Sequence, residues 1–454
     1  MLSLIINKDI FNCYNCIGTF SFNKKEFHSP FYLMQYVDGK IDIIVGGFFT
    51  VPFMERDSEE DDYCTITGKL FDNSAQIKIE EAVISNINFN VNNGKPTYCI
   101  LNVYKPVNIL FKDEKTKFNT IDVYLTNFLN NISRNSNFLE FNIQTDNYLI
   151  DFKSTYDYNN SKTLLYEDKE DVLITSLAKI DLKNQKVDIV YEMNKLTYLM
   201  SYATRTNISP VCFNFYNDKK LIKTVLWPAL TTKFSNKEKL IEPRNMKYFI
   251  EESYPIFLEN YYTFSLNIII SIYLESLLSN YVDSGYILLV VALESFLLSH
   301  EENCKQKGEE INPSSIKRIN KQMNKFFNEK EYDIPDNDLM ELSQKLAYNN
   351  TTLGEKLSLL KNKERFKSNL NLNSKDYDFP KIRNEIIHTG KVPKSIPYKK
   401  GNREINMSVE FARTLFLLDK IILSLLKYNG KFNDYLNIVS YQMFVPKYSF
   451  TQFS

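Results

Sequence analysis

The sequence predicts an α+β protein, with a mainly antiparallel β domain at residues 1–245, a helical bundle at residues 250–430 and a C-terminal tail at residues 431–454. Before residue 240, short apolar runs alternate with polar residues, and turn dipeptides such as Asp38-Gly39 separate the runs. After residue 250 the apolar residues recur with a helical period instead. Alternation with a period of two is typical of half-buried strands, whereas a period of 3.6 is typical of helices that pack on a core.

In the first half, one helix is expected among the strands. It covers residues 190–204, where Leu196, Leu199, Met200 and Ala203 share one face. Strands are expected at 31–51 (interrupted at Asp38-Gly39), 64–71, 75–84, 97–104, 138–143, 147–153, 171–182, 212–216 and 222–230.

The second half is expected to be helical throughout. A short helix should start at Pro380, a favoured first helical position, and end at Gly390, which suits the residue after a helix. Other helices are expected at 255–282, 283–300, 314–328, 337–348, 353–363 and 407–428, and 364–378 is polar and irregular.

Charge and cysteine content narrow the function classes. The 55 basic and 55 acidic residues cancel, which argues against a constitutive non-specific coat for nucleic acid. Residues 300–403 nevertheless carry 21 basic against 15 acidic residues, so a local basic surface is compatible with the sequence. Six scattered cysteines are not a disulfide framework. Cys13-x-x-Cys16 lacks a second ligand pair, so we expect no metal and no cofactor.

The sequence also indicates a cytoplasmic protein. The N-terminus lacks the charged start and long apolar stretch of a signal peptide. The longest uninterrupted apolar stretches are far shorter than the ~18 residues that a membrane span needs, so no membrane association is expected.

The short helix that starts at Pro380 carries the candidate chemistry. Asn384 and His388 are four residues apart and project from the same side of the helix. Arg383 starts from a different angle, but its side chain is long enough to reach the same phosphate. An imidazole can move a proton near neutral pH, and a guanidinium can hold a phosphate and its developing charge. Asn384 could orient the imidazole or donate to a phosphate oxygen. The alternative is a surface arginine with a histidine that satisfies carbonyls at the helix end.

Glu294 is the only charge in an otherwise apolar helical stretch, residues 285–298. A buried carboxylate needs a partner, and Arg383 is a natural candidate because the pair would hold the guanidinium ready for a phosphate. The alternative is that Glu294 pairs with another basic residue purely for the fold.

These residues resemble a known family. The segment "GYILLVVALESFLL", followed about ninety residues later by "IRNEIIHTG", is similar to the HEPN domain, in particular the branch named after the ApeA defence proteins. The resemblance covers roughly residues 255–430. The segment "YEMNKLTYLMSYATRTNISPVCFNF" resembles the N-terminal domain of ApeA-like proteins and extends the likeness to most of the chain.

The resemblance implies a metal-independent endoribonuclease in which Arg383, Asn384 and His388 are catalytic and Glu294 supports them. It implies RNA as the substrate, attack by the 2′-hydroxyl and an anti-phage abortive-infection role, with a phage-derived trigger acting through the N-terminal domain. It also implies a homodimer, or a higher even-numbered oligomer, with two motifs facing one cleft. The apolar faces of 283–300 and of the last helix, with Phe416, Leu417, Ile421 and Leu425, are the expected contact surface.

Two other function classes stay open. The helical domain could be a non-catalytic dimerisation module in a sensor protein. Alternatively, the β domain could be the main functional site and bind a ligand or a protein. The presence of Arg383, Asn384 and His388 together favours the enzyme.

Overall fold

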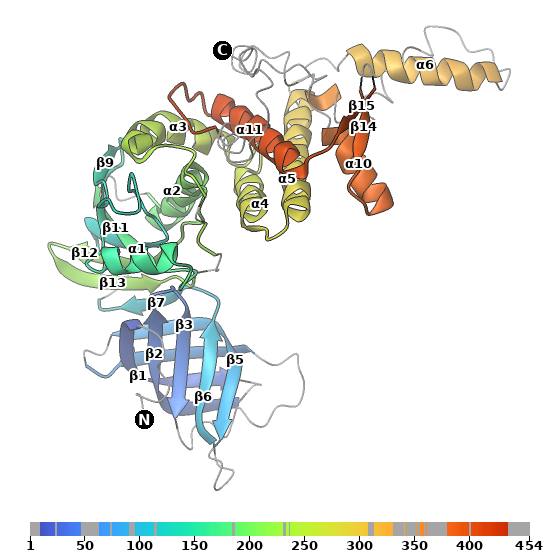
Figure 1. The fold of residues 1–454 in the computed structure, drawn as a ribbon. Helices are drawn as coiled ribbons and strands as arrows, with labels where there is room; N and C mark the ends of the chain where they lie inside the picture. The colour runs from blue at the N-terminus through green and yellow to red at the C-terminus, as the bar shows by residue number, and fades with distance from the viewer. Residues whose placement is uncertain are drawn as a thin grey trace. The chain divides into compact units, whose positions relative to one another are not determined.

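The computed structural model describes residues 10–22, 25–46, 63–72, 75–89, 96–112, 116–183, 187–229, 233–235, 237–306, 313–329, 340, 352, 355–357, 360, 379–398 and 401–434. The chain divides into two compact units, Met1–Asn236 and Lys237–Ser454. The first holds the β-sheet structure and the second holds most of the helices (Figure 1).

The first unit begins with a closed antiparallel barrel. Its strands are β1 (Ile10–Phe22), β2 (Lys25–Tyr36), β3 (Ile41–Gly46), β4 (Tyr63–Leu70), β5 (Gln76–Phe89) and β6 (Pro96–Val103). They pair in the order β4-β1-β2-β3-β6-β5, and the additional β4–β5 pairing closes the ring. Alternate residues such as Cys16, Phe20, Leu33 and Ile66 form the core. Closure requires glycine at Gly68, where a Cβ would lie 2.5 Å from the carbonyl oxygen of Ile17.

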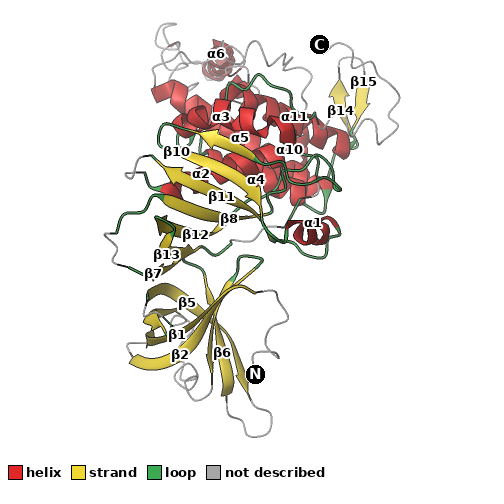
Figure 2. Ribbon diagram, turned by 90° about the vertical axis from the view of Figure 1, so that its left-hand side faces the viewer, coloured by secondary structure: helices red, strands yellow, loops and turns green. Residues whose placement is uncertain are grey.

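A second antiparallel sheet continues from the barrel, because Gln76–Lys78 of β5 pair with β7. Its strands are β7 (Val107–Leu110), β13 (Lys220–Leu226), β12 (Pro210–Asn217), β8 (Thr120–Thr126), β11 (Ile174–Leu182), β10 (Tyr148–Ser154) and β9 (Phe141–Gln144), in that order. Figure 2 shows these strands side by side. Helix α1 (Tyr158–Tyr166) contacts β11, and helix α2 (Ile189–Thr204) contacts β12.

The predicted β class of the first unit is confirmed, although several elements were not predicted. Helix α2 buries the expected face of Leu196, Leu199, Met200 and Ala203. The turn at Asp38-Gly39 is also present, with a φ of +80° at Gly39. The unpredicted elements are β1, β7, β8 and α1. Cys13 is exposed and Cys16 is buried, as expected for residues three apart on a strand.

The second unit is built around α5 (Val282–Gln306). The other elements are a 3-10 turn (Pro243–Asn245), α3 (Met246–Asn260), α4 (Leu266–Leu278), α6 (Pro313–Glu329), α10 (Phe379–Thr389), the hairpin β14 (Ser395–Tyr398) and β15 (Gly401–Glu404), and α11 (Met407–Leu425). Helix α5 packs against α4, α11 and α10. The unit is therefore helical, as predicted, with an unpredicted hairpin.

Four helix predictions need correction or fall mainly outside the described residues. The helix predicted at 255–282 is wrong, because α3 and α4 are separated by a turn at residues 261–265 in which Ser265 has a φ of +49°. The helix predicted at 283–300 extends to Gln306. Helices predicted at 337–348 and 353–363, and the tail beyond residue 434, fall mainly on residues that are not described.

Helix α5 is long and apolar enough to cross a membrane by length and composition alone. In the fold, however, its residues Leu289, Leu293, Phe296 and Leu297 are fully buried. A buried core helix passes the same test, so α5 is better explained as the central helix of the second unit.

Candidate active site

Helix α5 is held close to its neighbours at its first turn. A Cβ on Gly285 would lie 2.6 Å from the carbonyl oxygen of Ser276 on α4 and 3.2 Å from the ring of Phe411 on α11. A side chain there would force the helices apart, so glycine allows the close packing. Two and a half turns further along, Glu294 lies on a different face and keeps 21% of its side chain exposed.

Helix α10 docks on α5 through few residues. Phe379 and Ile382 are buried, and the Tyr286 hydroxyl donates a 3.5 Å hydrogen bond to the carbonyl oxygen of Phe379. Gly390 ends the helix with a φ of +66°, as the sequence predicts. Ile387 does not take part in this contact, because 53% of its surface is exposed.

The structure joins Arg383 to Glu294. The Arg383 Nε lies 3.0 Å from Glu294 Oε1, and Nη2 donates to Oε2 at 3.3 Å. This parallel two-point arrangement is the strong geometry for a guanidinium and a carboxylate. Both side chains remain partly exposed, at 31% for Arg383 and 21% for Glu294. The pair therefore lies at the surface of the bundle, where a ligand can reach the guanidinium.

Arg383 also keeps Asn384 in place. Its Nη1 donates a 3.0 Å hydrogen bond to Asn384 Oδ1. These contacts use three of the five N–H donors of a guanidinium, which leaves two for a further acceptor such as a phosphate oxygen. Asn384 thus contacts Arg383, whereas the sequence had suggested that it could orient the imidazole.

His388 lies in the last turn of α10 and is exposed. It makes no hydrogen bond or ion pair with any described residue, so its ring nitrogens face solvent. At 100° per residue, His388 is about 140° around the helix from Arg383. The helix brings Arg383, Asn384 and Glu294 together but does not place the imidazole against the guanidinium.

Several polar groups inside the bundle were not singled out from sequence. Asp419 of α11 is 1% exposed and accepts a 2.9 Å hydrogen bond from the Tyr273 hydroxyl of α4. Glu301 of α5 is ion-paired with Lys305 and with Lys356, at 3.5 and 2.8 Å. Asp419 and Glu301 are buried and have partners, so they stabilise the bundle and do not form a reactive site.

Among the residues that the structure describes, no group of three or more His, Cys, Asp or Glu side chains could hold a metal ion.

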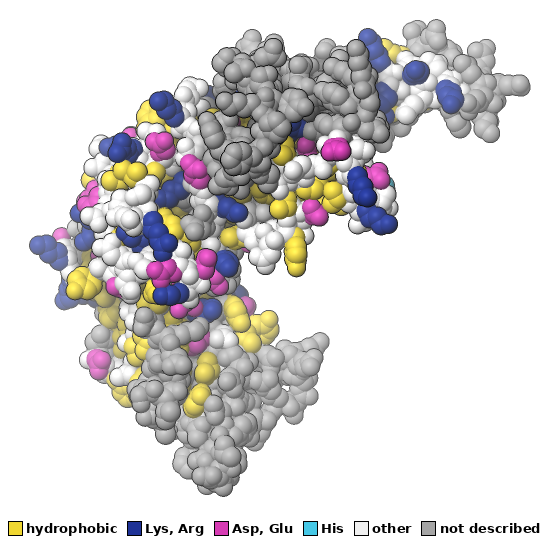
Figure 3. Space-filling view, viewed as in Figure 1, with side chains coloured by type: hydrophobic (Ala, Val, Ile, Leu, Met, Phe, Trp, Pro, Cys, Tyr) yellow, Lys and Arg dark blue, Asp and Glu magenta, His cyan; other side chains and the backbone are white. Residues whose placement is uncertain are grey.

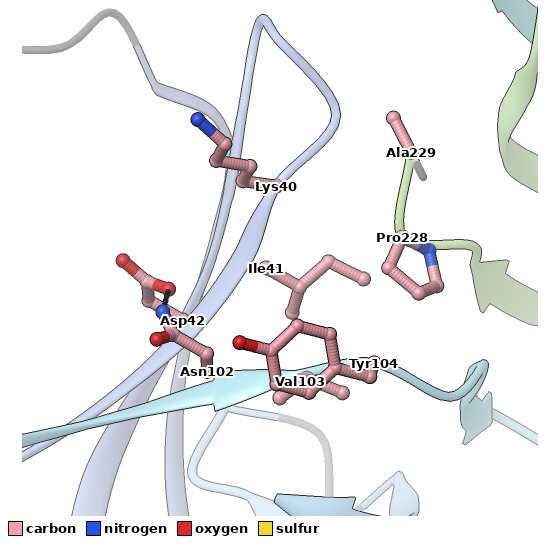
Figure 4. Close-up of a pocket in the computed structure, with 8 residues that line it drawn as sticks. All are labelled: Lys40, Ile41, Asp42, Asn102, Val103, Tyr104, Pro228 and Ala229. Carbon is pink, nitrogen blue, oxygen red and sulfur yellow. Dashed lines mark hydrogen bonds between the residues drawn. The ribbon is translucent and has the colours of Figure 1, made fainter. Parts of the chain in front are cut away.

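The β unit contains a separate pocket of about 460 Å³ (Figure 4). Its lining is Lys40, Ile41, Asp42, Asn102, Val103, Tyr104, Pro228 and Ala229. Lys40 pairs with Asp38 at 3.3 Å, and Asn102 Nδ2 donates to Asp42 at 2.6 Å. Because those polar groups have partners, the pocket best suits a small, mainly apolar group against the exposed ring of Tyr104.

No protein-family model, curated protein or solved structure matches the chain.

Proposed function

We propose that the protein is a metal-independent endoribonuclease of the HEPN type, with its active site at Arg383, Asn384 and His388. The observation that carries the proposal is the two-point pairing of Arg383 with Glu294, which fixes a guanidinium at the surface with two N–H donors free. A fixed cation with spare donors fits a phosphodiester, and a solvent-facing imidazole lies on the same short helix.

The chemistry is an attack within the RNA strand. A base removes the proton of a 2′-hydroxyl, the oxygen bonds to the adjacent phosphorus, and the bond from phosphorus to the 5′-oxygen breaks. The leaving 5′-oxygen takes up a proton, so the products are a cyclic phosphate and a 5′-hydroxyl end. His388 is suited to the proton transfers, and Arg383 to the charge on the phosphate oxygens.

A second copy of the chain would complete the site. In one chain, Arg383 and His388 project about 140° apart, and only one imidazole is present for two proton transfers. Val291 and Leu298 on α5 are 39% and 47% exposed, and they lie one turn on either side of Glu294. Ile387, which lies one turn after Arg383 on α10, is also exposed, and these three apolar side chains are here called the α5 strip. We propose a homodimer or higher even-numbered oligomer through this strip.

The expected contribution of α11 to this interface is corrected by the structure. Leu417, Ile421 and Leu425 are fully buried in the bundle, and Phe416 stacks on Phe432. Their apolar surface is already used inside one chain, so of the two expected contact faces the one on α5 remains.

On the ApeA-like resemblance, we propose that the chain acts in anti-phage abortive infection in the cytoplasm. The β unit would then restrain the nuclease until a phage-derived trigger arrives. These proposals rest on the resemblance of residues 191–215 and 285–390 and on the separate β unit.

The chemical groups at the ends of the cleaved RNA test the proposed reaction. Purified full-length chain is incubated with single-stranded RNA, with and without EDTA, and the new ends are analysed. We expect equal cleavage in both samples and cyclic-phosphate ends. Cleavage that stops with EDTA and returns with magnesium would contradict the proposal, as would 3′-hydroxyl products.

One observation favours a second function, a non-catalytic sensor. The pocket beside Tyr104 gives the β unit a site where a small ligand could bind. If the helical unit served only to dimerise, His388→Ala would leave every phenotype of the chain unchanged, while substitutions in the pocket would not.

A further inference from the structure

Helix α6 is the most strongly amphipathic of the described helices, with its charged and apolar residues on opposite sides. Lys317, Lys321 and Lys325 are all exposed and recur every four residues. Residues 313–328 contain no acidic residue at all. Figure 3 shows dark-blue Lys and Arg side chains along α6, with no Asp or Glu among them in this view. These three lysines are called the lysine row below.

The lysine row destabilises α6. Like charges four residues apart on a helix repel each other, and the row contains two such pairs. Elsewhere in the described part of this unit, helix lysines are offset by carboxylates, as in the exposed Lys247 with Glu251 and the half-buried Lys305 with Glu301. Lys317 and Lys321 have no such partner among the described residues. A row of this kind is stabilised when an anion with several charges binds along it.

The side of α6 opposite the lysine row is buried or half-buried. Ile319 is only 8% exposed, and Ile316 and Met323 are half-buried on the same side. A helix that lies in a membrane surface needs a free apolar face, and residues 316–325, the part of α6 whose side chains are described, do not offer one. The row is therefore better suited to a water-soluble polyanion than to a lipid surface.

Helix α6 is also tied to the helix that carries Glu294. Arg318 next to the row makes a two-point pair with Glu355, with distances of 2.9 and 3.1 Å. The next residue, Lys356, pairs with Glu301 of α5 at 2.8 Å. Adjacent residues thus connect α6 and α5, so the row belongs to the same helical unit as the candidate site.

We propose that the lysine row binds the phosphates of single-stranded RNA and holds the strand that Arg383 and His388 cleave. This inference rests on the proposed ribonuclease function and names the surface that recruits its substrate. Four residues of helix rise about 6 Å, so the three ammonium groups form a line rather than a cluster. A line of flexible point charges suits a phosphate backbone without reading its bases.

RNA binding by full-length chain tests the row. All proteins carry His388→Ala, so that the RNA stays intact, and fluorescence anisotropy with a labelled oligonucleotide measures Kd at several salt concentrations. The row variant combines Lys317→Gln, Lys321→Gln and Lys325→Gln, since glutamine keeps helix propensity. A matched control replaces Lys179, Lys219 and Lys220, three exposed lysines of the β unit, by glutamine.

We expect the row variant to bind RNA at least about tenfold more weakly. A plot of the logarithm of its binding constant against the logarithm of salt concentration should be less steep, by a slope of about 2. The control should bind like the parent. Equal RNA binding by the row variant and the control would overturn the inference. So would a row variant that binds RNA like the parent but no longer binds phosphatidylserine vesicles. Cleavage by the chain with His388 intact is measured separately. RNA binding through the row without any cleavage would refute the ribonuclease and leave the row as an RNA-binding surface.

Discussion

Arg383 on α10 forms a two-point ion pair with Glu294 on α5, although 89 residues separate the two in the sequence. The pair is half-exposed, which distinguishes it from an ion pair sealed in a core. A surface pair contributes little to the free energy of unfolding, typically about 1 kcal/mol or less. Its main physical effect is therefore to fix the direction of the guanidinium, and this leads to the first prediction.

Glu294→Gln should reduce RNA cleavage strongly while the fold survives. The glutamine side chain has one oxygen where glutamate has two, and it lacks the charge, so Arg383 loses its fixed position. We expect a fall in cleavage rate of about tenfold or more and a decrease in melting temperature of only a few degrees. Kinetics and thermal unfolding measure the two quantities.

Glu302→Gln is the matched control, because Glu302 is an exposed carboxylate on the same helix. It should leave both rate and melting temperature unchanged. A large drop in melting temperature for Glu294→Gln with cleavage per folded molecule unchanged would show that the pair serves only the fold.

The α5 strip should control assembly. Val291→Asp with Leu298→Asp places charges in the proposed contact, where an unpaired carboxylate is costly. We expect the chain to become monomeric by light scattering, and cleavage to fall with it. Ile268→Asp on α4 is the control, since Ile268 is equally exposed but lies on another helix. A dimer that Ile268→Asp disrupts and the α5 variant does not would place the interface elsewhere.

The contact that holds α6 should weaken in acid. Burial alone would raise the pKa of the Glu355 carboxyl, but hydrogen bonds from Arg318 and Thr352 outweigh it and hold the pKa below its ordinary value of about 4.5. A carboxyl whose pKa is lower in the folded state stabilises the fold above its unfolded pKa. That stabilisation is lost as the pH falls through the folded pKa, so the window lies below about 4.5.

Amide hydrogen exchange in α6 can follow this loss. Glu355→Gln should lower the protection of α6 at pH 7. The difference between the two chains should shrink as the pH falls below 4.5 and through the folded pKa, because the carboxyl of the original chain then becomes protonated. A difference that stays constant throughout an acid titration would mean that the charge of Glu355 does not hold α6.

The sequence predicted the parts of the site that depend on local composition. Glu294 was conspicuous because it is the one charge in an apolar helix, and Pro380 and Gly390 marked the ends of α10. The exposure of Ile387 could not be predicted, because it depends on how few residues α10 uses to contact α5. The bond from Arg383 to Asn384 depends on rotamers, which periodicity does not encode.

Non-local contacts explain the unpredicted parts of the fold. Strand β1 contains Asn12 and Asn15, which weaken its alternation, yet Asn12 donates to Gln35 across the β1–β2 pair. Barrel closure depends on the approach of β1 and β4 at Gly18 and Gly68, some fifty residues apart. The break between α3 and α4 falls at Tyr261 and Tyr262, residues that suit a helix as well as a turn.

The most direct test of the central claim is the count of cyclic-phosphate RNA ends produced by the purified full-length chain and by its His388→Ala variant. His388 is exposed and makes no hydrogen bond or ion pair with a described residue, so the variant should fold normally. We predict new cyclic-phosphate ends with the original chain and about a hundredfold fewer with the variant, since the substitution removes the imidazole proposed for the proton transfers from every copy of the chain. Equal numbers of ends with both proteins, or none with either, would contradict an active site at His388.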